Sequence, residues 1–170
     1  MSHRKRFFAA LLVFLGAALV ARSTSAEEEA CLEAVGGTSA GYVYSAYMFI
    51  GVTADAFAGG AYDASRVKQL MTVGIEMLAE SKKQLEKVKR AGLTRRDRAA
   101  VTEIQTVIGL LDAQARALVT YSKTGLDQDG RRYEKARHTA WRRVARLLGI
   151  NEETSEPLRE SPASAGGITR

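Results

Sequence analysis

Few side chains in this chain belong to the types that enzymes use as nucleophiles, general bases or metal ligands. Among 170 residues there is one cysteine, Cys31, and there are two histidines, of which only His138 lies beyond the first ten residues. Neither residue has the neighbours of a Ser-His-Asp or Cys-His site, and no His/Cys spacing matches a zinc site. The sequence therefore predicts no catalytic residue, no metal site and a protein that is not an enzyme.

One acidic segment has part of a calcium-loop pattern. Asp127-Gln128-Asp129-Gly130 matches the start of such a loop, but the third ligand position and the distal glutamate are missing. The interpretation that fits what remains is helix capping, with Asp127 or Asp129 at the start of a helix.

The elements that must position these residues are predicted to be helices. The only prolines are Pro157 and Pro162, so nothing between residues 27 and 156 is barred from a helix. Apolar residues recur at steps of three and four, and glycines or capping residues interrupt the pattern. Four helices are expected, over about Thr38–Ala58 with Thr38 or Ser39 as cap, from Asp63 to about Arg90, from Thr94 to about Ser122, and from Asp127 to Leu147.

Short connections decide the topology of these helices. Connections of about three to five residues force helices that are neighbours in sequence to run antiparallel. The predicted fold class is therefore all-α, an antiparallel up-down-up-down four-helix bundle over residues 38–150. An acidic lead, residues 27–37, precedes it, and residues 151–170, rich in Glu, Ser, Gly and Pro, are predicted to be a disordered tail.

The start of the chain has the parts of a secretory signal peptide. The basic residues 4–6 are followed by the uncharged apolar run Phe7–Ala21 and by the small residues Thr24-Ser25-Ala26, which a signal peptidase reads. We expect cleavage after Ala26. The apolar run is shorter than the roughly 20 residues that span a bilayer, so a periplasmic or secreted protein with no transmembrane segment after cleavage is expected.

Cleavage changes the charge of the protein. Of the 25 basic residues, four lie within residues 1–26, which hold no acid, so 21 basic residues remain against 19 acidic ones and the net charge falls to +2. A charge this small argues against nucleic acid as a partner. Cys31 is the only cysteine, so packing must stabilise the fold or Cys31 must pair between chains.

A methionine and a histidine are predicted to lie at the same height in the bundle. Met48 lies ten residues after Thr38 and His138 eleven before Gly149, which places both about 15 Å above one end at about 1.5 Å per residue. In export signal, helix order and this pairing, residues 38–149 resemble the periplasmic b-type cytochromes, which hold haem between a first-helix Met and a last-helix His. The resemblance implies non-covalent haem on Met48 and His138. It departs from that family in placing the histidine mid-helix, and no Cys-x-x-Cys-His for covalent attachment is present.

The first predicted helix is apolar on two sides. The stripe expected to face the core consists of Val43, Ala46, Ile50, Ala54 and Phe57. The nearly opposite face consists of Tyr44, Tyr47, Met48, Gly51 and Asp55. Either neighbouring helices cover both faces, or the second is a contact site for a homodimer or another protein, because tyrosine and methionine are enriched in interfaces.

Topology also gathers basic residues at one end of the bundle, which we term the basic pole. In an up-down bundle, the turn between the second and third helices lies at the same end as the C-terminus of the fourth. An open pole predicts an anionic partner, such as a phospholipid surface or an acidic protein, unless nearby acids neutralise it. The pole consists of Lys82, Lys83, Lys87, Lys89, Arg90, Arg95, Arg96, Arg98, Arg142, Arg143 and Arg146.

Together these patterns predict an exported, non-enzymatic helical bundle that acts by binding a protein or an anionic surface. Carriage of haem or another small ligand in the bundle interior is the alternative. An enzyme without a recognisable motif is the third possibility.

Overall fold

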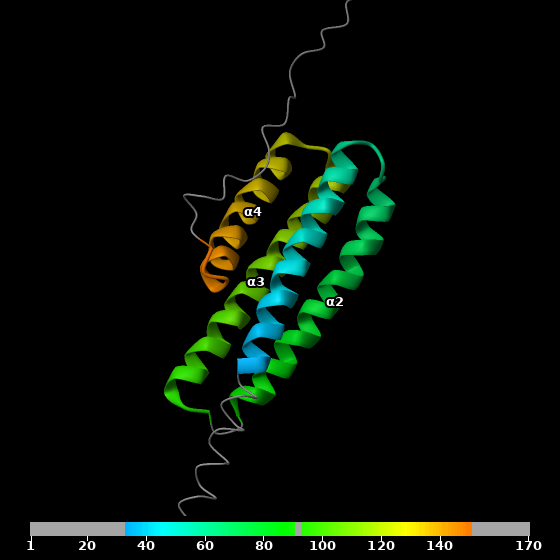
Figure 1. Cartoon of the computed structure of the whole chain (residues 1–170). Helices are drawn as coiled ribbons and strands as arrows, with labels where there is room; N and C mark the ends of the chain where they lie inside the picture. Colours follow the sequence, from blue (N-terminus) through cyan, green and yellow to red (C-terminus); the bar gives the residue numbers. More distant parts are fainter. Residues whose placement is uncertain (1–32, 91–92, 151–170) are drawn as a thin grey trace, which may run out of the picture.

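The computed structural model describes residues 33–90 and 93–150 and shows an all-α four-helix bundle over them, as the sequence predicts. The first helix covers residues 33–58. It is followed by α2 (Ala64–Lys89), α3 (Arg95–Thr124) and α4 (Asp127–Leu147). Figure 1 shows the helices side by side and joined by short turns, so each runs opposite to its sequence neighbour.

Local capping residues fix the ends of α2 and α3, as predicted. The Asp63 side chain accepts a hydrogen bond of 2.7 Å from the Arg66 backbone N–H and so caps α2. The Thr94 hydroxyl accepts one of 3.2 Å from the Asp97 backbone N–H at the start of α3. Gly125 ends α3 at a φ of 64°, in the left-handed region that glycine adopts without strain.

The first helix begins earlier than the sequence predicts. The first helix is already formed at residue 33, so Thr38 and Ser39 lie inside it and are not its cap. Gly36 and Gly37 lie inside it too, because each interior glycine costs a helix only about 1 kcal/mol.

The capping role predicted for Asp127 and Asp129 is wrong. The N-cap of α4 is Leu126, which makes no side-chain cap. Asp127 and Asp129 lie in the first turn, where their charge complements the helix dipole. Asp129 is buried and accepts hydrogen bonds from Thr124 Oγ1 at 2.8 Å and from Arg132 at 3.0 Å.

The four helices form a closed ring of contacts. α3 packs against α2 and α4, whereas no Cα atoms of α2 and α4 within the described chain lie within 8 Å of each other. The first helix contacts all three: Phe49 packs against Gly74 of α2, Phe57 against Tyr121 of α3, and Tyr47 against Trp141 of α4. The first helix therefore fills the space between α2 and α4.

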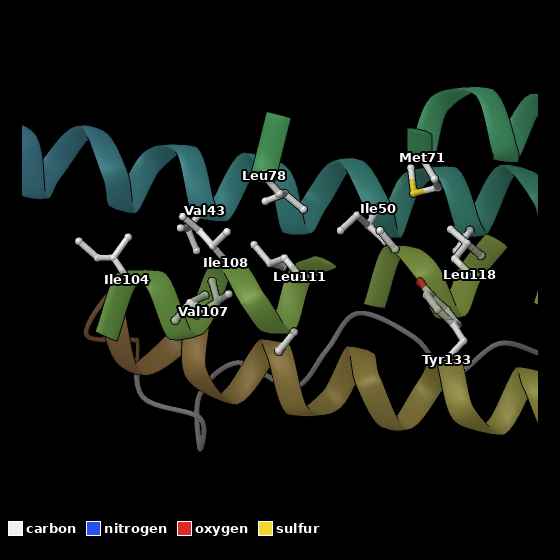
Figure 2. Close-up of a cluster of buried hydrophobic side chains, with 14 of the residues drawn as sticks. Val43, Ile50, Met71, Leu78, Ile104, Val107, Ile108, Leu111, Leu118 and Tyr133 are labelled. Carbon is white, nitrogen blue, oxygen red and sulfur yellow. The ribbon is translucent and has the colours of Figure 1, made fainter. Parts of the chain in front are cut away.

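The core lies along the axis of the bundle. Figure 2 shows side chains from every helix meeting there, with the longest series on α3. Of the predicted first-helix stripe, Val43, Ile50 and Ala54 are buried, and Ala46 and Phe57 are half-buried against the core. The main core contributions are Val43, Ile50, Val67, Met71, Leu78, Ile104, Val107, Ile108, Leu111, Leu118, Tyr133 and Val144.

Several predictions fall outside the described residues. These are the signal peptide over residues 1–26, residues 27–32 of the acidic lead with Cys31, and the tail over residues 151–170.

Candidate functional site

An apolar groove runs between the first helix and α2. It has a volume of about 340 Å³, and every side chain that lines it is apolar or aromatic. Phe49 stands on the first-helix side of the groove, and Val73 and Met77 stand on the α2 side. The floor lies at Gly74, where the Phe49 ring is 3.4 Å from the position that a Cβ atom would take. A Cβ atom at this distance would make an ordinary van der Waals contact with the ring, so Phe49 and α2 pack directly against each other here.

Several large apolar side chains around this groove are exposed to solvent. The exposed fractions are 40% for Phe49, 53% for Val73 and 54% for Met77. Val52 does not line the groove, but it follows Phe49 by three residues on the first helix and is 59% exposed. Large exposed hydrophobic residues occur elsewhere in the described chain mainly on the same first helix, at Tyr44 and Met48, with Leu126 apart from them. Contiguous exposed apolar surface of this kind marks interaction sites. We term Phe49, Val52, Val73 and Met77 the apolar face.

The predicted first-helix face is divided by the structure. Tyr44 and Met48 are exposed. Tyr47 packs against Trp141 of α4, with ring centroids 5.1 Å apart and planes 33° apart. Gly51 and Asp55 are half-buried. At Tyr47 the predicted face is thus covered by α4, whereas Tyr44 and Met48 remain open to solvent.

The apolar face was not predicted as a site from the sequence. The sequence feature that could have indicated it is the pair Val73 and Met77, which lie four residues apart on α2. Neither belongs to the core-facing stripe of Val67, Met71 and Leu78. Apolar residues at such outward positions of an amphipathic helix, where polar residues are the rule, would have indicated a second contact surface.

A second, polar pocket lies near the start of α4. Its volume is about 630 Å³, and side chains of both charge signs line it, among them Asp55, Glu134, Arg137 and His138. Arg137 forms an ion pair of 3.3 Å with Glu134. Burial works to lower the pKa of Arg137, but the Tyr47 hydroxyl and Glu134 outweigh it, so the pKa is raised. The charges of Arg137 and Glu134 in this pocket therefore compensate each other.

Polar atoms are buried in the core beside this pocket. The Tyr133 hydroxyl and both polar atoms of the Gln114 amide have no hydrogen-bond partner of good geometry among the described residues. Burial raises the pKa of Tyr133 to about 12, although the nearby amide of Gln114 lowers it in part. Figure 2 shows the Tyr133 hydroxyl directed into the bundle rather than outward. It is therefore a core group and not a group offered to solvent.

The proposed haem pair is not brought together in the interior. Met48 is 43% exposed, and His138 is exposed at the rim of the polar pocket. An axial ligand pair between helices needs both side chains inside the bundle. The layout shared with b-type cytochromes thus does not extend to the direction of these two side chains. Among the described residues, no group of three or more His, Cys, Asp and Glu side chains is placed to hold a metal ion.

The basic residues of α2 and α3 lie toward one end of the bundle, and some residues of the predicted basic pole are paired. Three of its residues form ion pairs, Lys83 with Glu80 at 3.7 Å, Lys89 with Glu86 at 3.7 Å, and Arg143 with Glu103 at 3.0 Å. Exposed basic residues remain at Lys82, Lys87, Arg90, Arg95, Arg96, Arg98, Arg142 and Arg146. Figure 1 shows α4 ending short of the turn between α2 and α3, so its arginines do not reach the tip of the pole.

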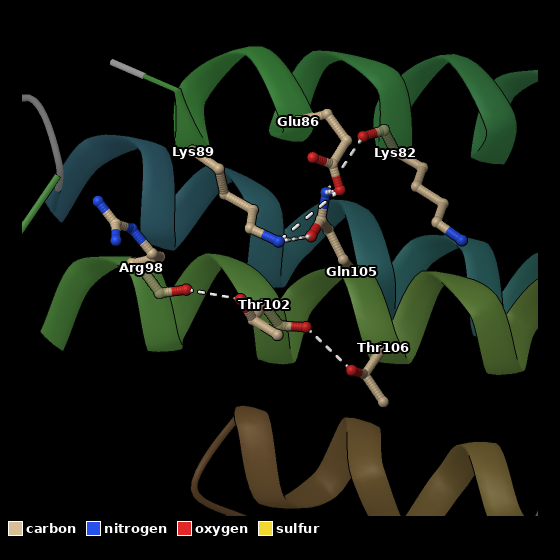
Figure 3. Close-up of polar contacts among 7 residues, drawn as sticks. All are labelled: Lys82, Glu86, Lys89, Arg98, Thr102, Gln105 and Thr106. Carbon is tan, nitrogen blue, oxygen red and sulfur yellow. Dashed lines mark hydrogen bonds and ion pairs between the residues drawn. The ribbon is translucent and has the colours of Figure 1, made fainter. Parts of the chain in front are cut away.

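A buried glutamine ties α2 to α3 within this pole. Gln105 donates to Glu86 at 2.8 Å and to the Lys82 carbonyl at 3.4 Å, and accepts from Lys89 Nζ at 3.1 Å (Figure 3). Gln105 is 7% exposed. Glu86 and Lys89 therefore have structural roles, and the exposed basic residues at this end of α2 include Lys82, Lys87 and Arg90.

Comparison with known families, curated proteins and solved structures finds no significant match to this chain. Within the described residues, no helix has the length and apolarity needed to cross a membrane.

Proposed function

We propose that this is an exported, non-enzymatic binding protein that holds apolar side chains of a partner protein in the groove between the first helix and α2. The observation that carries this proposal is the exposed apolar face around a groove lined only by apolar and aromatic side chains. The signal-peptide pattern at residues 1–26 supports its export.

The groove suits apolar side chains better than a polar ligand. Phe49, Val73 and Met77 surround it, and no charged residue lines it. Removing apolar surface from water contributes about 25 cal/mol per Å², whereas a polar group placed here would lose its hydrogen bonds to water without replacement. Met77 can also adapt its shape to different partners, because its side chain is flexible and unbranched.

The experiment is a titration with Nile red, a neutral dye whose fluorescence rises in apolar sites. Protein produced from the full coding sequence is compared with the variants Val73→Glu and Lys68→Glu at nanomolar concentration. Val73 is exposed on the apolar face, and Lys68 is exposed on the same helix but does not line the groove. Val73→Glu is expected to weaken dye binding at least tenfold, because it places a charge at the rim. Lys68→Glu is expected to leave it unchanged.

Circular dichroism is measured on all three proteins as a check that they remain folded. Dye binding by the wild type that Val73→Glu does not reduce would place the apolar site elsewhere and overturn the proposal. Absence of dye binding by the folded wild type would also overturn it.

A second candidate function rests on the exposed part of the basic pole. Lys87 and Arg90 are exposed at the end of α2, and Arg95 and Arg96 are exposed at the start of α3. Figure 1 shows these two helix ends beyond the end of α4. A cluster of this kind attracts anionic surfaces at low salt. We propose attachment to anionic lipid headgroups as an additional activity of this end, independent of the groove.

A further inference from the structure

We propose that the partner seated on the apolar face is a second copy of this chain, bound antiparallel about a twofold axis that passes beside Val73. This proposal rests on the proposed function of the groove and names its occupant. The argument comes from the spacing of charges along α2, from the position of Phe49, and from the size of the face.

Charges on the outer side of α2 are arranged symmetrically about Val73. Arg66 lies seven residues before Val73 and Glu80 lies seven residues after it, and all three side chains are exposed. Seven residues return a helix to nearly the same side, so the three share one stripe. At about 1.5 Å per residue, Arg66 and Glu80 each lie about 10 Å from Val73 along the helix.

An antiparallel copy of α2 therefore meets opposite charges at both ends of the apolar stretch. Rotation by 180° about an axis through Val73 places Arg66 of one copy opposite Glu80 of the other, and the pairing repeats at the symmetric position. A parallel arrangement in register places Arg66 opposite Arg66, which repels. Charge complementarity thus selects the antiparallel arrangement.

The present partners of these two residues can be given up at little cost. Arg66 donates to Gln69 at 2.7 Å on its own helix, and its guanidinium lies 6.0 Å from the Tyr62 ring centre. Glu80 accepts from Gln84 and pairs with Lys83 at 3.7 Å. All of these contacts are exposed and join residues within four positions of each other in the sequence. Exposed pairs of this kind stabilise a fold only weakly.

The first helix supplies the aromatic centre of the same interface. Phe49 lies against Gly74, so it stands at the height of Val73 and close to the proposed axis. The two copies of Phe49 then meet one another near the axis, while Val52 and Met77 flank them. No charged residue occurs between residues 34 and 54, so this half of the interface brings no like charges together.

The face suits a dimer with a modest interface. A twofold axis at Val73 pairs residues 64–82 of the two copies of α2, which is about 28 Å of helix, and two adjacent helices are about 20 Å wide. The resulting footprint of about 560 Å² per copy lies in the size range of weak, reversible interfaces.

A charge-exchange experiment tests the arrangement. Sedimentation velocity and equilibrium are measured on protein from the full coding sequence, on Arg66→Glu, on Glu80→Arg, and on the double variant. Each single variant is expected to weaken the dimer about tenfold, because it creates two like-charge contacts. The double variant restores opposite charges at both positions and is expected to return to within about twofold of the wild type. Lys68→Glu, which carries a similar change of charge off the face, is expected to dimerise like the wild type.

The outcomes separate this inference from the proposed function. A wild type that stays monomeric up to about 100 micromolar overturns the second copy as occupant, while dye binding at the groove would still support a different partner protein. A dimer that neither single variant weakens, or that the double variant does not restore, overturns the antiparallel arrangement about Val73. A dimer with the expected pattern also predicts that Nile red leaves the wild-type groove as protein concentration rises.

Discussion

Gln114 is a polar residue at a position where the core would accept an apolar one. Its side chain is fully buried, and its amide lacks a hydrogen-bond partner of good geometry among the described residues. A buried amide left unpaired costs about 1 to 3 kcal/mol relative to one that is paired. We therefore expect Gln114→Leu to raise the free energy of unfolding by about 1 kcal/mol, as measured by urea denaturation.

Gln84→Leu is the matched control, because Gln84 is exposed on α2. Its effect on unfolding is expected to stay within about 0.5 kcal/mol. A loss of stability in Gln114→Leu would show that the amide has a partner in solution, such as an enclosed water molecule.

Tyr133 predicts a dependence of stability on high pH. Burial raises its pKa to about 12 in the folded protein, while a tyrosine in the unfolded chain titrates near 10. Between these values the unfolded chain loses the proton first, so the stability present below pH 10 falls as the pH rises toward 12. The loss attributable to Tyr133 is on the order of 1 to 2 kcal/mol.

Urea denaturation of the wild type and of Tyr133→Phe at pH 8 and pH 11 isolates this contribution. Tyr133→Phe is expected to lose less stability over that interval, because it has no proton at this position to lose. Equal losses in the two proteins would mean that Tyr133 ionises in the folded state as readily as in the unfolded chain.

At the scale of single residues, the sequence predicts burial better than exposure. The helical period identifies Val43, Ile50 and Ala54 as core, and all three are buried. It does not predict that Tyr47 stacks on Trp141 while Phe49 stays open, because the period defines sides of a helix and not which neighbour covers each side. That choice depends on the order of helices around the bundle and on the close approach at Gly74.

At the scale of elements, caps decide where helices begin. Thr94 caps α3 through the Asp97 backbone N–H, and its hydroxyl also donates to the Asp97 carboxylate at 2.5 Å. Losing such a cap costs about 1 kcal/mol. Thr94→Ala is therefore expected to lower the free energy of unfolding by about that amount in thermal or urea denaturation.

Thr106 provides the control on the same helix. It is exposed, and its hydroxyl donates only to the Thr102 carbonyl one turn earlier (Figure 3). Thr106→Ala is expected to be neutral or slightly stabilising, because alanine has the higher helix propensity. If both substitutions had the same effect, the Thr94 cap would contribute nothing specific.

The helix boundaries show which signals are local enough to be predicted. Asp63 and Thr94 mark the starts of α2 and α3 because a capping side chain bonds within three residues of itself. Leu126, the N-cap of α4, has no capping side chain and gives no such signal. At the first helix, Thr38 has the chemistry of a cap but lies inside a longer helix, because the residues before it also adopt helical geometry.

At the scale of the whole molecule, the basic pole predicts salt-sensitive attachment to anionic vesicles. Arg95 and Arg96 are exposed at the start of α3, where acidic residues favour a helix, so Arg95→Glu with Arg96→Glu should remain folded. We expect this double variant to lose most of the co-sedimentation that the wild type shows with phosphatidylserine-containing vesicles at low salt. Neutral vesicles should retain little of either protein.

The control is the same change of net charge at the opposite end of the bundle, Lys123→Glu with Arg131→Glu. Both residues are exposed. This variant is expected to co-sediment like the wild type, because the screening length at about 0.1 M salt is only about 10 Å. An equal loss in both double variants would mean that net charge, and not the basic pole, governs attachment.

The contact between Tyr47 and Trp141 makes the protein its own optical reporter. Trp141 is the only tryptophan of the chain, it is half-buried, and it lies on the last helix against a ring from the first. Its emission therefore responds to whether the first helix has packed against α4. In a stopped-flow refolding experiment the intrinsic fluorescence would time this closure, the contact that joins the two helices most distant in sequence, without any attached label.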